Sequence, residues 1–352
     1  MYSRKLDKVP EFLIENSKPK FGSYIGTPKS LSISGIKFPY GIIPLPKWIT
    51  NLRIRSNFTF VFDTEDYLGS LDIIDMKLAG FYEVNLWHKE SNHRYSYRGV
   101  TGIHRHLVPK NMNKGVCSTY RKFRYVRIVW DKERNRFTFV FRLRGDGIRP
   151  NFSGNFIAPY GETESAFTSV LPYPTMRRCY VSYQRPFLCD SGIQAAKTDT
   201  PFFHSEKSLC LLISTRAYFK FRTVSKYVVG IGKVDNHEVL FRISNISNLP
   251  KNSDDNNENV LFYDGQVTAL PYVMITHTFG VSKKWVIQDT EGMVDLVFTP
   301  KSVRQKFVSA IVLEGQYNFI FGTYEGVIVT KDGKSIMIKD FPGVAKNMRT
   351  RL

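Results

Sequence analysis

The chain has 352 residues and a formal net charge of +19, with 50 Lys and Arg against 31 Asp and Glu. Hydrophobic residues make up 42% and aromatic residues 14%, so the chain can bury a sizeable core and favours β-strands. The positive charge favours anionic partners, but it does not choose among nucleic acid, anionic lipid and an acidic protein.

Several kinds of site are excluded by missing patterns. The four cysteines (Cys117, Cys179, Cys189 and Cys210) form no Cys-x-x-Cys pair and have no histidine at metal-ligand spacing, so we expect no metal. A Cys179–Cys189 disulfide is an alternative, but reduced thiols in an intracellular, cytoplasmic protein are the simpler expectation. No window holds the 18 or more apolar residues of a transmembrane segment. Phosphate-loop, dinucleotide, serine-hydrolase and zinc-protease motifs are absent, and we expect no cofactor.

Residues 1–20 are charged, and we expect a flexible basic arm there. Alternation of polar and aromatic residues with a period of two predicts a half-buried strand at Asn57–Asp63. Further strands are predicted at Leu71–Leu78 and Phe81–His88. The early part of the chain is therefore predicted to be a strand-rich body that follows the arm.

The clearest hairpin runs from Tyr125 to Leu143. Alternate positions are apolar in both strands, which predicts one buried side; these residues are Val126, Ile128, Trp130, Phe137, Phe139, Phe141 and Leu143. The other positions and the preceding residues are basic. A basic face of this kind is typical of a solvated strand surface and also of a polyanion-binding surface, whose candidate residues are Arg121, Arg124, Arg127, Arg142 and Arg144.

Gly145–Gly161 is rich in Gly, Pro and Asn, which predicts a long loop. Short strands separated by tight turns follow from about residue 200 to 340, and the turns are Asp235-Asn236, Asp264-Gly265, Glu291-Gly292 and Asp332-Gly333. Such spacing predicts an all-β antiparallel barrel or sandwich. Only Pro300–Ser309 is a candidate for a short helix.

The stretch from Asn257 to Gly265 joins a polar run to an apolar strand and a turn. The acidic run Asp254–Glu258 lacks the spacing and central glycine of a calcium loop, so we expect a solvated loop there. Glu258 and Asn259 stand at its end, where the strand begins.

Four stretches after residue 180 form an ordered set of motifs. They are the aromatic strand Tyr180–Gln184 with a turn reaching Gly192, the segment Glu258–Gly265, the strands Trp285–Ile287 and Val294–Pro300, and the C-terminal run from Phe321 through Lys331–Lys334 to Gly343 and Arg351. Together they resemble the domain-of-unknown-function family numbered 2804, which is similar to the two-barrel lipocalin-like proteins that include the carotenoid hydratases. The resemblance implies two lipocalin-like antiparallel barrels, or strongly curved sheets, packed together. The expected domains are 21–190 and 191–352.

The chain departs from that family's pattern at positions of chemical interest. Ile213-Ser214-Thr215 stands where the family has Asp-x-His, and Ser225 and Tyr227 stand where it has two tryptophans. Lys346 replaces a usual glutamate, and Leu352 replaces a tryptophan, whereas Arg216, Tyr218, Phe219 and Arg222 keep the family's kind of residue. General acid–base catalysis needs a titratable group beside the reacting atom. Ser214 and Thr215 do not supply one.

Three hypotheses follow. The first is a non-catalytic binder of an apolar or amphiphilic ligand, whose ligand-binding residues are Glu258, Asn259, Arg216, Tyr218, Arg222 and His277. The second, implied by the resemblance, is a hydratase, cyclase or isomerase acting on an isoprenoid-like lipid, with Glu258 as acid or base and His277 and Tyr263 as helpers. The third is polyanion or anionic-membrane binding through the basic hairpin.

Overall fold

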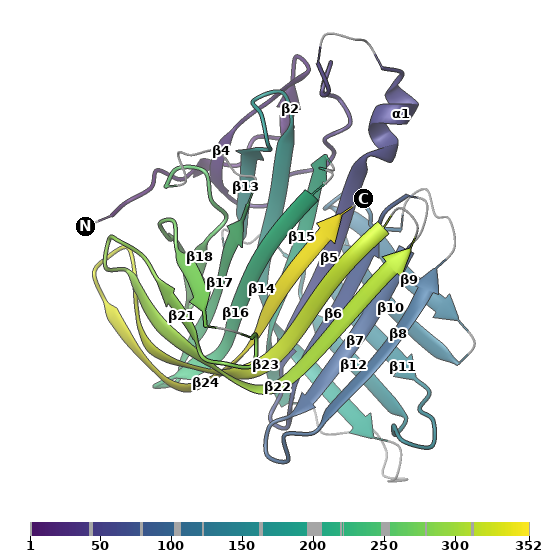
Figure 1. Cartoon of the computed structure of the whole chain (residues 1–352), viewed down its shortest axis with the longest axis vertical. Helices are drawn as coiled ribbons and strands as arrows, with labels where there is room; N and C mark the ends of the chain where they lie inside the picture. Colours follow the sequence, from purple (N-terminus) through teal and green to yellow (C-terminus); the bar gives the residue numbers. More distant parts are fainter. Residues whose placement is uncertain are drawn as a thin grey trace.

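Two large curved β-sheets pack against each other in the computed structural model of the chain (Figure 1). The first closes almost completely into a barrel, and the second forms a half-barrel. The prediction of an all-β fold made of two barrels or curved sheets is therefore confirmed. The structure describes residues 2–41, 45–77, 80–101, 107–121, 123–161, 165–195, 206–218, 220, 222–247, 254–278, 280–310 and 313–351.

The first sheet follows the order β8-β7-β6-β5-β15-β14-β12-β11-β10-β9, with β13, β4 and β1 attached beside β14. Its strands are β1 (Asp7–Lys8), β4 (Gly22–Ile25), β5 (Ile54–Asp63), β6 (Tyr67–Asp75), β7 (Gly80–His88), β8 (Arg94–Thr101), β9 (Lys114–Arg121), β10 (Arg124–Asp131), β11 (Arg136–Leu143), β12 (Phe152–Ala158), β13 (Phe167–Pro172), β14 (Cys179–Ala195) and β15 (Glu206–Tyr218). All pairings are antiparallel except that of β1 with β4. The two end strands of this sheet, β8 and β9, are not paired with each other. A side-chain contact spans the gap beside them, where Arg124 Nη1 of β10 donates to the Arg98 carbonyl of β8 at 3.1 Å.

The second sheet follows the order β19-β18-β17-β16-β24-β23-β22-β21-β20. Its strands are β16 (Arg222–Val234), β17 (His237–Ile246), β18 (Val260–Tyr263), β19 (Gln266–Ala269), β20 (Met274–His277), β21 (Trp285–Gln288), β22 (Val294–Ala310), β23 (Leu313–Val329) and β24 (Ser335–Arg351). A small ribbon, β2 (Ile14–Glu15) with β3 (Lys18–Pro19), and one helix, α1 (Lys47–Leu52), lie outside both sheets. Of the described residues, none belongs to a helix that could span a bilayer.

The interior of the barrel is filled by aromatic rings. Phe60 lies 5.0 Å from Phe139 and Phe62 lies 4.7 Å from Phe156, measured between ring centroids. The hairpin β10–β11 supplies much of this core, because all seven apolar residues predicted to face it are buried. The predicted strands at Asn57–Asp63, Leu71–Leu78 and Phe81–His88 correspond to β5, β6 and β7 and are confirmed. The second one ends earlier than predicted, at Asp75, and Leu78 lies outside the described residues.

The tight turns of the second sheet are also confirmed. Asp264 and Gly265 both have positive φ angles, +46° and +76°, and connect β18 to β19 through two residues. Asp235 and Asn236 do the same between β16 and β17, with φ angles of +50° and +67°. Two consecutive positive φ angles match the right-handed twist of the flanking strands, and Gly, Asn and Asp tolerate them best.

Two sequence-based assignments are wrong. The predicted loop at Gly145–Gly161 contains β12, which pairs with both β11 and β14. Its glycine is a packing feature, because a Cβ on Gly154 would lie 2.3 Å from the Phe141 ring. The predicted short helix at Pro300–Ser309 belongs to β22, where the register with β23 shifts between Pro300 and Ser302. In this segment, pairing of β22 with β23 outweighs the weak helical pattern of the sequence.

The two sheets meet through an apolar cluster. Val61 and Leu211 of the barrel lie in it together with Val229 of the second sheet. Trp87 and Phe321 stack across the interface with ring centroids 5.8 Å apart. In Figure 1, β22 and β23 of the second sheet lie in front of β6 and β7 of the barrel. Burial of these large side chains is the main force that holds the sheets together.

The N-terminal residues also join the two sheets. Tyr2 donates to the Asp254 carbonyl at 2.9 Å, and Arg4 donates to the carbonyls of Asn257 and Asn259 at 3.0 and 3.3 Å. A few residues later, β1 pairs with β4 of the first sheet. The flexibility expected for residues 1–20, like the division into 21–190 and 191–352, stays a prediction. The chain passes from the first sheet to the second between Tyr218, the last residue of β15, and Arg222, the first residue of β16.

The four cysteines are free and buried. Cys179 and Cys189 lie on the same extended strand, β14, so about 33 Å separates their Cα atoms at 3.3 Å per residue. A disulfide needs Cα atoms less than about 7 Å apart. The alternative of a Cys179–Cys189 disulfide is therefore wrong.

We predict that Arg4→Met lowers the free energy of unfolding by about 2 kcal/mol, because two buried carbonyls lose a charged donor. Lys5→Met is the matched control, since the Lys5 side chain is 86% exposed. Its expected effect is within about 0.5 kcal/mol of zero. Urea unfolding of the three proteins measures the difference, and equal values for the two variants would contradict an anchoring role for Arg4.

Candidate functional site

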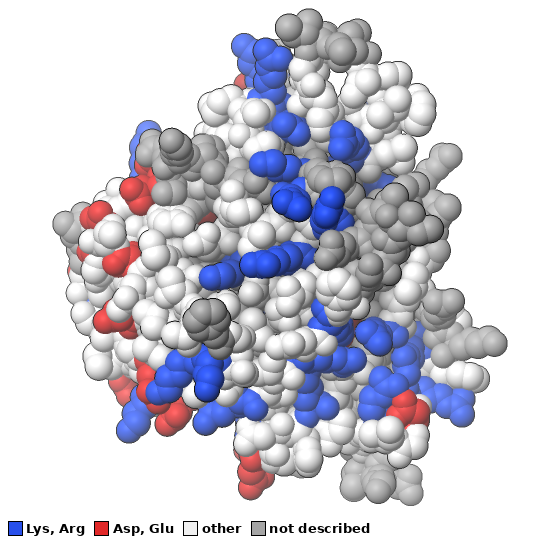
Figure 2. Space-filling view, viewed as in Figure 1, with Lys and Arg blue, Asp and Glu red and all other residues white. Residues whose placement is uncertain are grey.

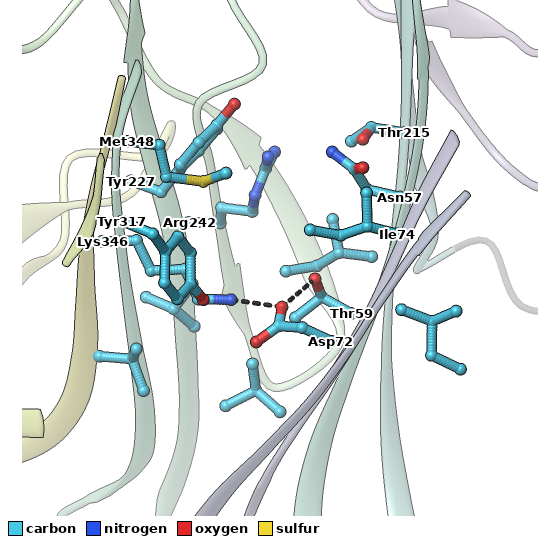
Figure 3. Close-up of a pocket in the computed structure, with 15 residues that line it drawn as sticks. Asn57, Thr59, Asp72, Ile74, Thr215, Tyr227, Arg242, Tyr317, Lys346 and Met348 are labelled. Atoms are coloured by element: carbon cyan, nitrogen blue, oxygen red, sulfur yellow. Dashed lines mark hydrogen bonds and ion pairs between the residues drawn. The ribbon is translucent and has the colours of Figure 1, made fainter. Parts of the chain in front are cut away.

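A small pocket of about 60 Å³ lies between the two sheets (Figure 3). The barrel contributes Asn57, Thr59 and Asp72, and the second sheet contributes Tyr227 and Lys346. Apolar side chains line the rest, including Ile74, Val344 and Met348. Figure 3 shows the two groups of side chains facing each other from strands of the two sheets. Polar groups from both sheets therefore converge on one place.

Asp72 links the sheets through a buried ion pair. Its Oδ1 accepts from Lys346 Nζ at 2.5 Å and from Thr59 Oγ1 at 2.7 Å, the two dashed lines of Figure 3. Ser70 Oγ donates to the other carboxylate oxygen at 3.1 Å. Farther along the interface, Glu83 pairs with Lys306. Each of these charges meets an opposite charge from the other sheet, as buried charges require.

A second buried ion pair stands behind the pocket. Arg242 lines the pocket, and its Nη1 lies 2.6 Å from Glu258 Oε2. Tyr180 donates to the same carboxylate oxygen at 3.0 Å, and Gln184 donates to the Glu258 carbonyl at 2.8 Å. Glu258 is fully buried, so the predicted solvated loop at Asp254–Glu258 is wrong at its last residues. The neighbouring strand of the barrel covers it.

The electrostatics keep the pocket's groups in fixed protonation states. Burial and the nearby Glu258 charge raise the pKa of Tyr227 to about 12. Burial, together with Asp72 and Glu83, raises the pKa of Tyr317 well above its ordinary value. Burial alone would lower the pKa of Arg242, but the Glu258 carboxylate raises it overall. At neutral pH the phenols are therefore neutral hydrogen-bond donors and the arginine is charged.

A second small pocket, also about 60 Å³, adjoins the first. Both are lined by Asn57, Thr215, Tyr227 and Met348. Tyr173 and Tyr180 line only the second one. Met348, one of the residues that line both spaces, has an unbranched side chain of the kind that adapts to irregular gaps.

The residues predicted to bind a ligand are not gathered in one place. Glu258 stands behind Arg242 as described, whereas Asn259 holds backbone together, since its Oδ1 accepts from the Ser244 amide at 2.8 Å and its Nδ2 donates to the Pro271 carbonyl at 2.9 Å. Arg216 faces the barrel interior and donates to Ser56 Oγ and the Val108 carbonyl, each at 2.8 Å. Asn259 and Arg216 are thus bound to protein groups.

The other candidates lie on different elements. Tyr218 donates to the Ile33 carbonyl at 2.8 Å, and it lines the second pocket. Arg222 is exposed at the start of β16, where it is paired in register with Arg351. His277 packs against Trp285 in the second sheet, 4.8 Å between ring centroids. Tyr263 lies at the turn after β18, beside His237. None of these last three lines the pocket between the sheets.

Three of the five arginines predicted for the basic hairpin are exposed. Arg127, Arg142 and Arg144 are exposed on the outer surface of the barrel. Arg124 is half-buried over the Tyr97 ring, and the side chain of Arg121 lies outside the described part of the structure. Figure 2 shows many more Lys and Arg than acidic side chains on the face it presents, with the acids mostly along the left edge and the bottom.

Four departures from the expected family pattern line the pocket between the sheets: Ile213, Thr215, Tyr227 and Lys346. They come from β15, β16 and β24, so their proximity depends on the packing of the two sheets. Asp72, Thr59, Arg242 and Tyr317 were not singled out from the sequence. Their only local signal was a polar residue within a strand, which also describes any solvated strand face.

A family model described as "Domain of unknown function (DUF2804)" matches residues 48–352. The chain belongs to the DUF2804 family. No curated protein sequence matches it. Solved structures similar to this DUF2804 protein include one from Nitrosomonas europaea provisionally assigned as AttH, with 10% identity, a TM-score of 0.47, and coverage of 89% of this chain and 98% of that one.

Two further solved structures are similar. CghA has 11% identity and a TM-score of 0.45, and the match covers 95% of this DUF2804 chain and 99% of CghA. Kievitone hydratase from Nectria haematococca has 10% identity and a TM-score of 0.42, with coverage of 97% and 98%. In the described part of this chain, no group of three or more His, Cys, Asp or Glu side chains could hold a metal ion.

We predict that Glu258→Gln lowers the free energy of unfolding by about 3–5 kcal/mol, because it leaves the Arg242 charge buried without its partner. The double variant Glu258→Gln/Arg242→Met should lose less than the sum of the two single variants. Asp264→Asn is the control, since Asp264 and His237 form a half-exposed surface pair. That pair should contribute at most about 1 kcal/mol. If urea unfolding gave the same loss for Glu258→Gln and Asp264→Asn, the buried pair would not be structural.

Proposed function

We propose that this protein is a non-catalytic binder that holds a small amphiphilic molecule with an uncharged polar head between its two sheets. One observation carries the proposal: both sheets direct polar side chains into a single pocket, and the charges there cancel in pairs. Asp72 neutralises Lys346, and Glu258 neutralises Arg242. An anionic or cationic head would have to break one of these pairs, which is unfavourable in a buried site.

Neutral polar groups also line the pocket. Tyr227 and Tyr317 contribute phenols that keep their protons, and Asn57 adds an amide whose oxygen accepts from Arg55 Nε at 3.3 Å. A hydroxyl or carbonyl group is a suitable partner for such side chains. The apolar part of the ligand would contact Ile74, Val344 and Met348, as in the usual mixture of apolar walls and few polar groups in ligand sites.

Size limits the ligand. Each space measures about 60 Å³, whereas a cavity that binds benzene measures about 150 Å³. A ring-sized molecule therefore needs Met348 to move and the two spaces to merge. A full isoprenoid chain would need a much larger separation of the sheets. The barrel interior is a poorer candidate, because phenylalanine rings fill it.

The chemistry of the lining supports binding rather than catalysis. Its described residues include no histidine, and its carboxylate, Asp72, is engaged by Lys346 and Thr59. Glu258 is sealed behind Arg242, away from a reacting atom. The hydratase, cyclase or isomerase hypothesis stays a prediction. Wild-type turnover that Glu258→Gln leaves unchanged would remove the acid or base on which it depends.

We predict that cyclohexanol binds to the wild type and that Met348→Trp abolishes this binding, because the larger side chain fills the shared boundary of the two spaces. Met337→Trp is the matched control, since Met337 is 67% exposed on the same strand. Saturation-transfer NMR measures the binding, and cyclohexanecarboxylate, the anion of similar shape, should give a weaker signal than cyclohexanol at this pocket.

Organic extraction of the purified protein followed by mass spectrometry provides the second test. A molecule that copurifies with the wild type and with Met337→Trp, but not with Met348→Trp, would support the pocket. Equal cyclohexanol signals in all three proteins, with no extracted ligand in any of them, would contradict the proposal.

A further inference from the structure

Arg185 is a buried cation at one end of the barrel. Its side chain is 1% exposed, and its Nη2 donates to the Gly161 carbonyl at 2.9 Å and more distantly to the Tyr160 carbonyl at 3.4 Å. The guanidinium lies over the rings of Tyr160 and Phe187, 4.2 and 4.6 Å from their centroids. Among the described residues, no carboxylate pairs with Arg185, and its buried Nε has no hydrogen-bond partner.

The buried charge of the Arg185 guanidinium needs an interaction that replaces its lost hydration. A charged group removed from water is expensive unless it is paired and hydrogen-bonded. Carbonyl groups and aromatic faces stabilise a guanidinium in part, but they carry no net charge. Arg216, another fully buried arginine of the barrel, has Asp75 as a nearby negative charge. Arg185 has no such charge among the described residues.

Arg185 also lines an open groove of about 470 Å³. The groove runs between the β1–β4 pair and the end of β12, and its walls include apolar side chains of Leu6, Val9, Ile25 and Met112. Lys8 stands exposed at its rim. Asp7, also in the lining, is already paired with Lys5 at 3.1 Å. The groove thus combines a buried arginine, two lysines (Lys8 and Lys132) and apolar walls.

This groove is separate from the pocket between the sheets. Gln184, the preceding residue of β14, donates to Glu258 in the second sheet. Successive side chains of a strand point to opposite faces, so Arg185 faces the barrel side. The two sites share no lining residue. Binding at one does not require binding at the other.

We propose that this groove binds an organic carboxylate, with the carboxylate at Arg185 and a short apolar tail along Val9 and Ile25. A carboxylate supplies the missing negative charge and accepts from guanidinium donors in a charge-assisted hydrogen bond. The apolar walls distinguish such a ligand from inorganic phosphate, which has no tail. The test therefore compares a carboxylate, its neutral analogue and phosphate.

Isothermal titration with hexanoate, 1-hexanol and inorganic phosphate provides the main test. We expect hexanoate to bind at least about tenfold more tightly than 1-hexanol, and Arg185→Gln to weaken hexanoate about tenfold to hundredfold, in line with hydrogen bonds to charged groups. Arg216→Gln is the matched control for loss of a buried arginine and should leave hexanoate affinity unchanged. Met348→Trp should also leave it unchanged.

Val9→Trp keeps the test informative if Arg185→Gln does not fold. It narrows the groove while Arg185 remains in place, and it should abolish hexanoate binding. Crystals soaked in bromohexanoate should show an anomalous bromine peak in the groove. The proposal is overturned if hexanoate and 1-hexanol bind equally, if phosphate binds more tightly than hexanoate, or if Val9→Trp binds hexanoate as the wild type does.

Discussion

The structure depends on ion pairs that join the two sheets where they bury carboxylates between them. The apolar contact of Trp87 with Phe321 brings the sheets together, but strands with alternating side chains also place Asp72 and Glu83 on the same buried face. Each finds a lysine on the second sheet, Lys346 and Lys306 respectively. Removing one member would leave a buried charge and cost several kcal/mol, about as much as a large part of a domain's net stability.

This pairing also positions the candidate site. Lys346 and Asp72 hold β24 and β6 at a fixed separation, and Arg242 is held against Glu258 on the far side of the pocket. The pocket therefore lies between the Asp72–Lys346 pair, which joins the two sheets, and the Arg242–Glu258 pair, which belongs to the second sheet. A ligand bound there would contact both sheets, so its binding would stabilise their packing by mass action. The groove at Arg185 sits on the opposite face of β14 and belongs to the barrel alone.

Much of the fold could be predicted from local patterns. The hairpin β10–β11 and the turn at Asp264-Gly265 follow from a two-residue period and from residues that tolerate positive φ. Strand β12 could not be predicted, because the segment around it has the Gly, Pro and Asn content of a loop. One of those glycines, Gly154, is there because a side chain would collide with the Phe141 ring. The burial of Glu258 was also hidden, because β14 of the barrel covers it from 70 or more residues earlier in the chain. Thr215 and Lys346 stood out in the sequence only as departures from the expected family pattern, and sheet packing brings them together in the pocket.

Solvent-soaked crystals would show whether small molecules enter the space between the sheets or the barrel interior. Crystals of the wild type would be soaked in cyclohexanol and in isopropanol, and ordered solvent would be located in difference density. We expect ordered alcohol beside Tyr227 and Met348, with the Asp72–Lys346 pair intact. Alcohol ordered among Phe60, Phe139 and Phe156, with none between the sheets, would contradict it.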